Sequence, residues 1–163
     1  MAEIDSDVAT DVADVLPEEE IRVCLLRIGE DTYAIAIDLL TEIIIPQRVF
    51  PVPTTPPHVL GVINLRGNIV PIVDIRFALS LPSQSGAGQI AILKFGSITL
   101  GIVVDNVFEV VSVPVSRVMT IPADYGAQAG RNRSRFFKGI IQREAGLAAL
   151  LNIELILEEI KLT

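Results

Sequence analysis

The feature that most constrains this chain is an internal repeat. Residues 26–44 align with residues 93–111 at a spacing of 67. Residues 61–75 align with residues 139–153 at a spacing of 78, so the second copy has the longer loop. The chain therefore contains two copies of one unit. Because a β unit this small cannot bury a large core alone, we expect the two copies to pack together or to exchange strands.

Short runs rich in Ile and Val, separated by Gly, Pro or Asp, indicate that both copies consist of β-strands. The predicted strands are Ile21–Ile28, Thr32–Ile37, Glu42–Ile45, Val62–Asn64, Ile69–Ile75, Gln89–Phe95, Ile98–Val104, Phe108–Val113, Gly139–Gln142 and Leu147–Asn152. Short strands at this spacing are typical of a closed barrel or a sandwich, so the predicted fold class is all-β. Asp38–Thr41 and Asp105–Val107 are predicted as tight helical turns, each capped by its Asp. The apolar spacing in residues 153–162 predicts a short C-terminal helix.

The charged residues are unevenly distributed. Eight of the 20 Asp and Glu residues lie in residues 1–20, which hold no Lys or Arg, so the rest of the chain is nearly neutral. We expect residues 1–20 to form a disordered acidic arm and residues 21–160 to form the folded domain. A short amphipathic helix that docks on a partner is the alternative for the arm, since its apolar residues have helical spacing. The folded part lacks the basic face of a nucleic-acid binder.

The sequence predicts neither a membrane span nor a secretory signal. The longest apolar stretches are interrupted by charged residues such as Asp74 and Asp105, and none approaches the ~20 apolar residues that a span needs. The N-terminus is acidic, whereas a secretory signal begins with basic residues. We therefore predict that the protein is cytoplasmic, which agrees with a single unpaired cysteine.

The composition argues against catalysis and against a bound metal. One histidine, His58, and one cysteine, Cys24, leave too few side chains for a zinc site, an iron–sulfur cluster or a nucleophile with its base. The sequence contains neither a phosphate-binding nor a dinucleotide-binding glycine motif. We therefore predict that the protein is not an enzyme and that it holds no cofactor and no metal.

Two segments leave an alternative function open. Residues 131–138 combine three arginines and a lysine with two phenylalanines, which suits single-stranded nucleic acid, although a solvated loop is favoured. Residues 46–58 hold five prolines, which favours an extended connector, although proline-rich segments also bind aromatic grooves. The alternative is therefore a β-barrel module that binds peptides or nucleic acid.

Arg66 is the most informative charged residue. It is the only charge between Gly61 and Val73, and it is predicted to lie at the tip of a tight hairpin. An arginine held by two flanking strands is well placed for a directed salt bridge. We expect Arg66 to pair with Glu42 or with a carboxylate of a partner.

The segment Gly61–Arg76, with the sequence GVINLRGNIVPIVDIR, closely resembles the signature of the CheW family, the coupling proteins of bacterial chemotaxis-type signalling. The resemblance extends from about Ile21 to about Leu157. It implies a fold of two small five-stranded SH3-like β-barrels, packed on a shared hydrophobic seam, with short helices. It also implies that the protein has no catalytic activity.

The resemblance further implies two partners, the cytoplasmic tip of a methyl-accepting chemoreceptor and the regulatory domain of a CheA-type histidine kinase. The protein would then be an adaptor in a chemotaxis, phototaxis or pilus-motility pathway, recruited to membrane-associated receptor arrays without inserting into the membrane and without binding nucleic acid. The resemblance implies that seven residues lie at the partner-binding faces: Leu40, Glu42, Ile44, Leu60, Gly61, Asn64 and Arg66.

Overall fold

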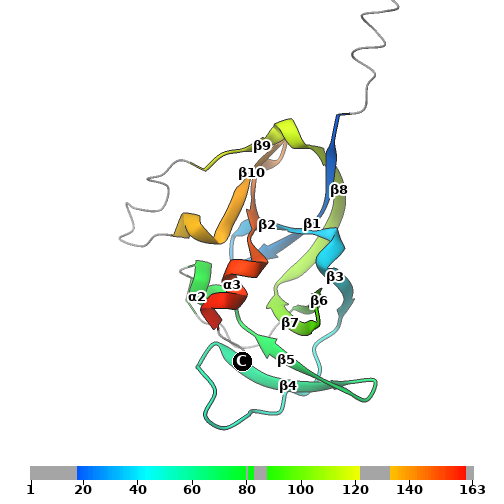
Figure 1. Ribbon diagram of the computed structural model, residues 1–163, viewed down its shortest axis with the longest axis vertical. Helices are drawn as coiled ribbons and strands as arrows, with labels where there is room; N and C mark the ends of the chain where they lie inside the picture. Colours follow the sequence, from blue (N-terminus) through cyan, green and yellow to red (C-terminus); the bar gives the residue numbers. More distant parts are fainter. Residues whose placement is uncertain (1–17, 80, 83–87, 122–132, 161–163) are drawn as a thin grey trace, which may run out of the picture.

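The computed structural model describes residues 18–79, 81–82, 88–121 and 133–160, and it is an all-β protein with two sheets (Figure 1). The six-stranded sheet contains, in spatial order, β8 (Asn106–Pro114), β1 (Glu20–Ile28), β2 (Asp31–Ala36), β11 (Gly146–Leu151), β10 (Phe137–Arg143) and β9 (Val118–Met119). The five-stranded sheet contains β3 (Leu40–Ile44), β6 (Gln89–Phe95), β7 (Ile98–Val104), β5 (Asn68–Val73) and β4 (Val59–Leu65).

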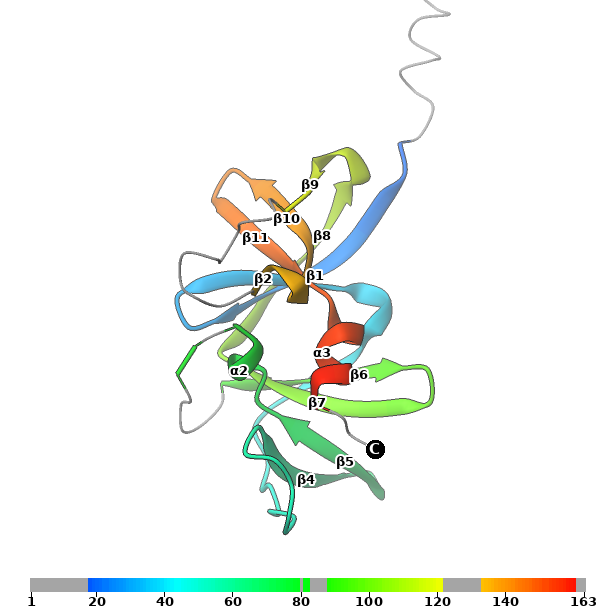
Figure 2. The same ribbon diagram turned by 60° about the vertical axis from the view of Figure 1, so that its left-hand side comes forward.

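Short helices connect or follow the strands. They are the 3-10 helices η1 (Ile37–Leu39), η2 (Val115–Arg117) and η4 (Arg133–Phe136), and the α-helices α2 (Arg76–Leu79) and α3 (Ile153–Ile160). The two α-helices lie between the sheets (Figure 2). Each follows the second strand of a hairpin, α2 after β5 and α3 after β11, so they occupy equivalent places in the two copies of the repeat.

The two copies of the repeat exchange strands. Strands β1 and β2 of the first copy pair with β8 and β11 of the second copy, whereas β6 and β7 of the second copy pair with β3 and β5 of the first. The pairs β2–β11 and β5–β7 are parallel, and each joins the two copies within one sheet. This arrangement confirms the second of the two expectations from the repeat, since each sheet needs strands from both copies.

The largest core lies between the sheets and contains residues from both. Ile28 and Ile35 of the six-stranded sheet share it with Leu93 and Ile102 of the five-stranded sheet, and all four side chains are at most 1% exposed. Two smaller cores lie within single sheets, one around Leu25 and one around Ile63. The shared core is the hydrophobic seam that the family resemblance implied. It cannot form until both copies of the repeat have folded.

The structure confirms all ten predicted strands to within a few residues, and it corrects three other expectations. The turn predicted at Asp105–Val107 is wrong, because β8 begins at Asn106 and the Asp105 carboxylate binds elsewhere. η1 occupies only the first half of the turn predicted at Asp38–Thr41, because β3 begins at Leu40, and no side chain caps η1. In the described residues, no ladder joins β8 to β9 or β3 to β4, so hydrogen bonding leaves both sheets open rather than closed as barrels.

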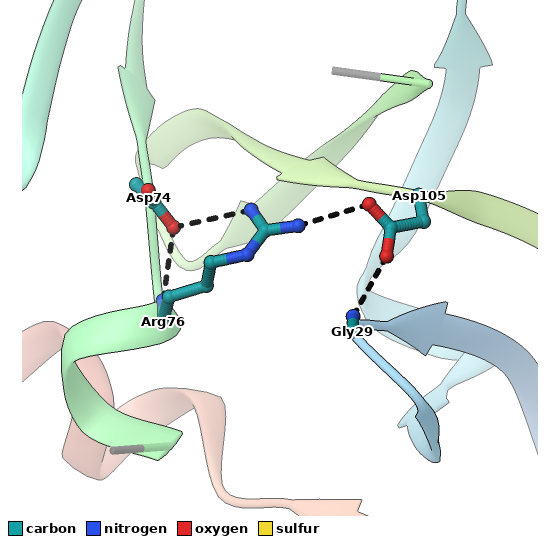
Figure 3. A network of polar contacts seen from close by, with 4 residues as sticks. All are labelled: Gly29, Asp74, Arg76 and Asp105. Atoms are coloured by element: carbon teal, nitrogen blue, oxygen red, sulfur yellow. Dashed lines mark hydrogen bonds and ion pairs between the residues drawn. The ribbon is translucent and has the colours of Figure 1, made fainter. Parts of the chain in front are cut away.

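A buried network of polar contacts joins the two sheets where strands cross between them (Figure 3). The Arg76 side chain is 3% exposed, and its Nη2 donates to Asp105 Oδ1 at 2.9 Å. The Arg76 backbone N–H donates to Asp74 Oδ1 at 3.0 Å, and Nη1 lies 3.6 Å from the same oxygen. The other Asp105 oxygen accepts the Gly29 N–H at 2.7 Å. Asp105 therefore ties the start of α2 to the β1–β2 turn.

We expect Asp105→Ala to lower the free energy of unfolding by about 2–3 kcal/mol, because the substitution leaves the buried Arg76 guanidinium without its closest carboxylate. The loss is smaller than for a fully buried pair because the Asp105 side chain is 31% exposed. Chemical denaturation measures the change. Asp38→Ala is the matched control, since Asp38 holds the equivalent position in the first copy, is exposed and caps nothing. Equal losses in the two variants would contradict the role given to Asp105.

Candidate partner-binding site

A two-residue turn positions Arg66 at the tip of the β4–β5 hairpin. Leu65 pairs with Asn68, and the two residues between them have positive φ angles, 50° at Arg66 and 87° at Gly67. This is the backbone of a type I′ turn, which matches the twist of the strands and favours Asn or Gly at its first position. The Gly67 N–H donates to Asn64 Oδ1 at 2.8 Å and holds the turn. A non-glycine residue with positive φ is unusual and often marks a functional site.

The Arg66 guanidinium forms a two-pronged ion pair with Glu42 on β3. Nη1 donates to Glu42 Oε1 at 3.1 Å, and Nη2 donates to Oε2. The hydrogen bond from Arg66 lowers the pKa of the Glu42 carboxyl below its usual value, and the bond from Glu42 raises the pKa of Arg66. Of the two partners that the sequence allowed for Arg66, the structure shows Glu42. Because the pair is exposed, it contributes little to stability.

An open hollow with both polar and apolar lining residues surrounds the ion pair. Glu42 and Arg66 line it together with Ile69 and Ile98, which are 66% and 44% exposed. Lys94 on β6 also lines the hollow. Large exposed apolar side chains around an oriented charge are typical of a protein interface rather than of a catalytic pocket. The sequence analysis missed Ile69, Ile98 and Lys94, although each lies within two residues of a Gly-containing hairpin turn.

The other residues implied by the resemblance have different environments. Leu40 is half-buried against the core between the sheets, and Ile44 is half-buried against the core of the five-stranded sheet. Leu60 is 39% exposed and open to a partner. Asn64 holds the Arg66 turn through its side chain. The structure thus brings Glu42, Asn64 and Arg66 together, whereas Leu40 and Ile44 also pack inside the domain.

Gly61 has a structural role in this region. Its φ angle is +143°, and a Cβ atom on it would overlap the backbone carbonyl of Phe50. Phe50 lies in the proline-rich connector and pairs with Val62. The Phe50 N–H donates to the Val62 carbonyl with an N to O distance of 2.8 Å, and the Val62 N–H donates to the Phe50 carbonyl at 2.9 Å. Only glycine lets the connector approach β4 this closely. A contact between Gly61 and a partner stays a prediction.

The remaining candidate residues face the interior or each other. Cys24 is buried, and burial raises the pKa of its thiol. His58 stacks on Phe77 with ring centres 4.4 Å apart. In the basic segment, Arg135 pairs with Glu159 and lies over the Phe136 ring. Within the described ranges, no group of three or more His, Cys, Asp or Glu side chains could hold a metal ion, and no helix is long and apolar enough to cross a membrane.

Comparisons with known proteins agree on one family. The family model of the CheW-like domain matches residues 22–161. The chain is 28% identical to a chemotaxis protein CheW of Helicobacter pylori, over 87% of this chain and 84% of the relative. It is 29% identical to a chemotaxis protein CheW of Thermotoga maritima, over 91% of this chain and 94% of the relative. The crystal structure of the scaffolding protein TtCheW from Thermoanaerobacter tengcongensis superimposes with a TM-score of 0.72 at 19% identity, covering 87% and 90% of the two chains.

We expect Gly61→Ala to lower the free energy of unfolding by about 2 kcal/mol or more, because the added methyl group forces the Phe50 backbone away from β4. Gly67→Ala is the matched control: its φ is also positive, but the space around it is open, so only backbone strain of about 1 kcal/mol remains. Urea denaturation of both variants measures the difference. A Gly61→Ala protein as stable as Gly67→Ala would show that the connector does not pack against β4 in this way.

Proposed function

The chain belongs to the family of CheW-like domains, and on that premise we propose that it is a non-catalytic adaptor that couples chemoreceptors to a CheA-type histidine kinase. The pathway is one of chemotaxis, phototaxis or pilus motility. The match covers 84% and 94% of the two CheW proteins compared above, so the proposal concerns most of the length of these relatives.

The observation that carries the proposal is the exposed ion pair between Glu42 and Arg66. Its side chains are 28% and 67% exposed, so a second macromolecule can reach both. A guanidinium carries five N–H donors, and Glu42 accepts two hydrogen bonds from Arg66, which leaves three donors for a carboxylate or carbonyl of a partner. Glu42 thus orients the Arg66 guanidinium for contact with a partner. Such an oriented charge contributes more to the specificity of binding than to its affinity.

The surface around the pair supplies the apolar part of such an interface. Ile69 and Ile98 extend it along the rim of the hollow, and Leu60 adds an exposed apolar side chain on β4. An oriented charge beside exposed apolar side chains supplies both specificity and apolar area that a partner can bury. We place one partner on this face of the five-stranded sheet and leave the six-stranded sheet for the other, so that the rigid seam between the sheets holds both.

We further propose that the adaptor works in the cytoplasm and is recruited to receptor arrays at the membrane. The two partners meet there, because a chemoreceptor presents its signalling tip on the cytoplasmic side. The adaptor needs no membrane segment of its own for this role, since the receptor supplies the attachment.

The proposal predicts that Arg66→Glu lowers the affinity for either the kinase regulatory domain or the receptor tip at least tenfold, because it reverses the charge that the partner reads. Calorimetric titration against each partner measures the effect, and circular dichroism verifies the fold. Arg27→Glu, an exposed arginine on β1 of the other sheet, is the matched control, and it should stay within about twofold for the partner whose affinity Arg66→Glu lowers. Unchanged affinity of Arg66→Glu for both partners would contradict the proposal.

The double variant Glu42→Arg/Arg66→Glu separates two explanations. It re-forms the ion pair with exchanged charges, so the local geometry is kept while the presented charge is reversed. We expect binding to remain weak, because the partner reads the charge of Arg66 and not only the shape of the turn. Full recovery of binding would mean that the pair acts only as a local brace.

A further inference from the structure

The described chain begins beside η2, at one end of the six-stranded sheet. The Ser116 N–H donates to the Glu18 carboxylate at 3.2 Å, and the Val115 N–H donates to the Glu19 carbonyl at 2.9 Å. β1 starts at the same end of the sheet as the link from β8 to β9 (Figure 1). The segment 1–17, which lies outside the described residues, therefore joins the described chain one or two residues before the contacts with η2.

A groove lies next to this point, between the end of β8 and β10. It occupies the gap that the ladders of the six-stranded sheet leave open. Pro114 lines one side and Gln142 the other, and Arg117 and Arg143 line both of the adjoining hollows that make up the groove. One acidic side chain, Glu144, also lines it.

Exposed apolar side chains border the arginines. The Arg143 guanidinium lies 5.9 Å from the centre of the Phe108 ring, and Phe108 and Val110 on β8 are 41% and 47% exposed. Met119 on β9 is 38% exposed and lines the groove. Open strand edges beside exposed apolar side chains invite pairing with other chains, and proteins usually cover them.

Residues 1–17 have the complementary chemistry. They contain five acidic residues and no Lys or Arg, and their apolar residues are interspersed with the acids. The acidic residues are Glu3, Asp5, Asp7, Asp11 and Asp14. Opposite charges and shared apolar character make this segment a fitting occupant for a groove that has two arginines and an apolar border.

We propose that residues 1–17 of this chain bind in the groove between β8 and β10, where their carboxylates pair with Arg117 and Arg143. Residues 1–17 are favoured over a separate acidic peptide because they are covalently attached to the chain beside the groove. At ~3.3 Å per residue the 17-residue segment reaches up to about 55 Å from its attachment beside the groove, and a tethered segment acts at an effective concentration of the order of 1 mM. A contact with an intrinsic Kd of about 1 mM is then formed about half of the time.

Paramagnetic relaxation tests the proposal. A nitroxide attached to Val8→Cys in a Cys24→Ala background should broaden the backbone amides of Ser116, Gln142 and Arg143 in the full-length ¹⁵N-labelled chain. The double variant Arg117→Glu/Arg143→Glu should reduce the broadening at least threefold, and so should 0.5 M NaCl, which screens exposed charges. Arg27→Glu is the matched control and should leave the broadening unchanged.

A second measurement avoids the cysteine substitutions. Asp5, Asp7, Asp11 and Asp14 are replaced together by Asn in the full-length chain, and amide chemical shifts are compared with the wild type. We expect shifts to cluster at Arg117, Gln142 and Arg143. Shifts and broadening that are absent from the groove, or that concentrate around Arg66, would overturn the proposal.

A mixed sample identifies the chain that supplies the segment. Spin-labelled chains without ¹⁵N are mixed with ¹⁵N chains without a label, at the same total concentration. We expect no broadening in this mixture, because the groove is filled by the segment of its own chain. Broadening of the same amides in the mixture would mean that a second copy fills the groove, and this outcome would overturn the proposal as stated.

Discussion

The exchange of strands between the two copies of the repeat is the constraint on which the rest of the structure depends. Strands β2 and β11 pair in one sheet and β5 and β7 in the other, so neither copy can complete a sheet alone. The core between the sheets draws side chains from both copies for the same reason. The contact between Arg76 and Asp105 fixes the crossing, because a buried guanidinium is stable only where carboxylates meet it.

Because the strand crossing and the shared core make the domain stable, the domain tolerates a strained and exposed residue at the tip of the β4–β5 hairpin. Arg66 keeps a positive φ because the β4–β5 ladder and the Asn64 side chain hold the turn on both sides. The ion pair with Glu42 then directs the guanidinium across the open side of the five-stranded sheet. Stability comes from the cores, so the exposed Glu42–Arg66 pair is free for the recognition proposed above. The cost of one unfavourable backbone conformation is small against a shared core of this size.

The sequence predicted features that depend on local pattern and failed on those that depend on distant contacts. Alternation of apolar residues located the ten strands, and the repeat indicated that the two copies would pack together or exchange strands. The pairing of Arg66 with Glu42 was one of two stated options. The role of Asp105 was missed, because a capping pattern competes with a contact to Arg76 that only the folded chain provides. The structural role of Gly61 was also missed, since no local pattern shows that the Phe50 backbone lies against it.

Strand exchange also determines when each strand can meet its partner during synthesis. Thr32 to Ala34 of β2 lie against Ala148 to Leu150 of β11, more than a hundred residues later in the chain. At about 5–20 residues per second, β2 emerges and waits of the order of 5–25 s for its neighbour. For the first part of that interval, until β6, β7 and β8 emerge, the apolar face of the first hairpin lacks most of its native neighbours. The five-stranded sheet can form once β7 has emerged, but the six-stranded sheet is completed only as synthesis ends. The exposure of the nascent chain to chaperones and to premature association therefore depends on its topology as well as on the stability of the finished domain.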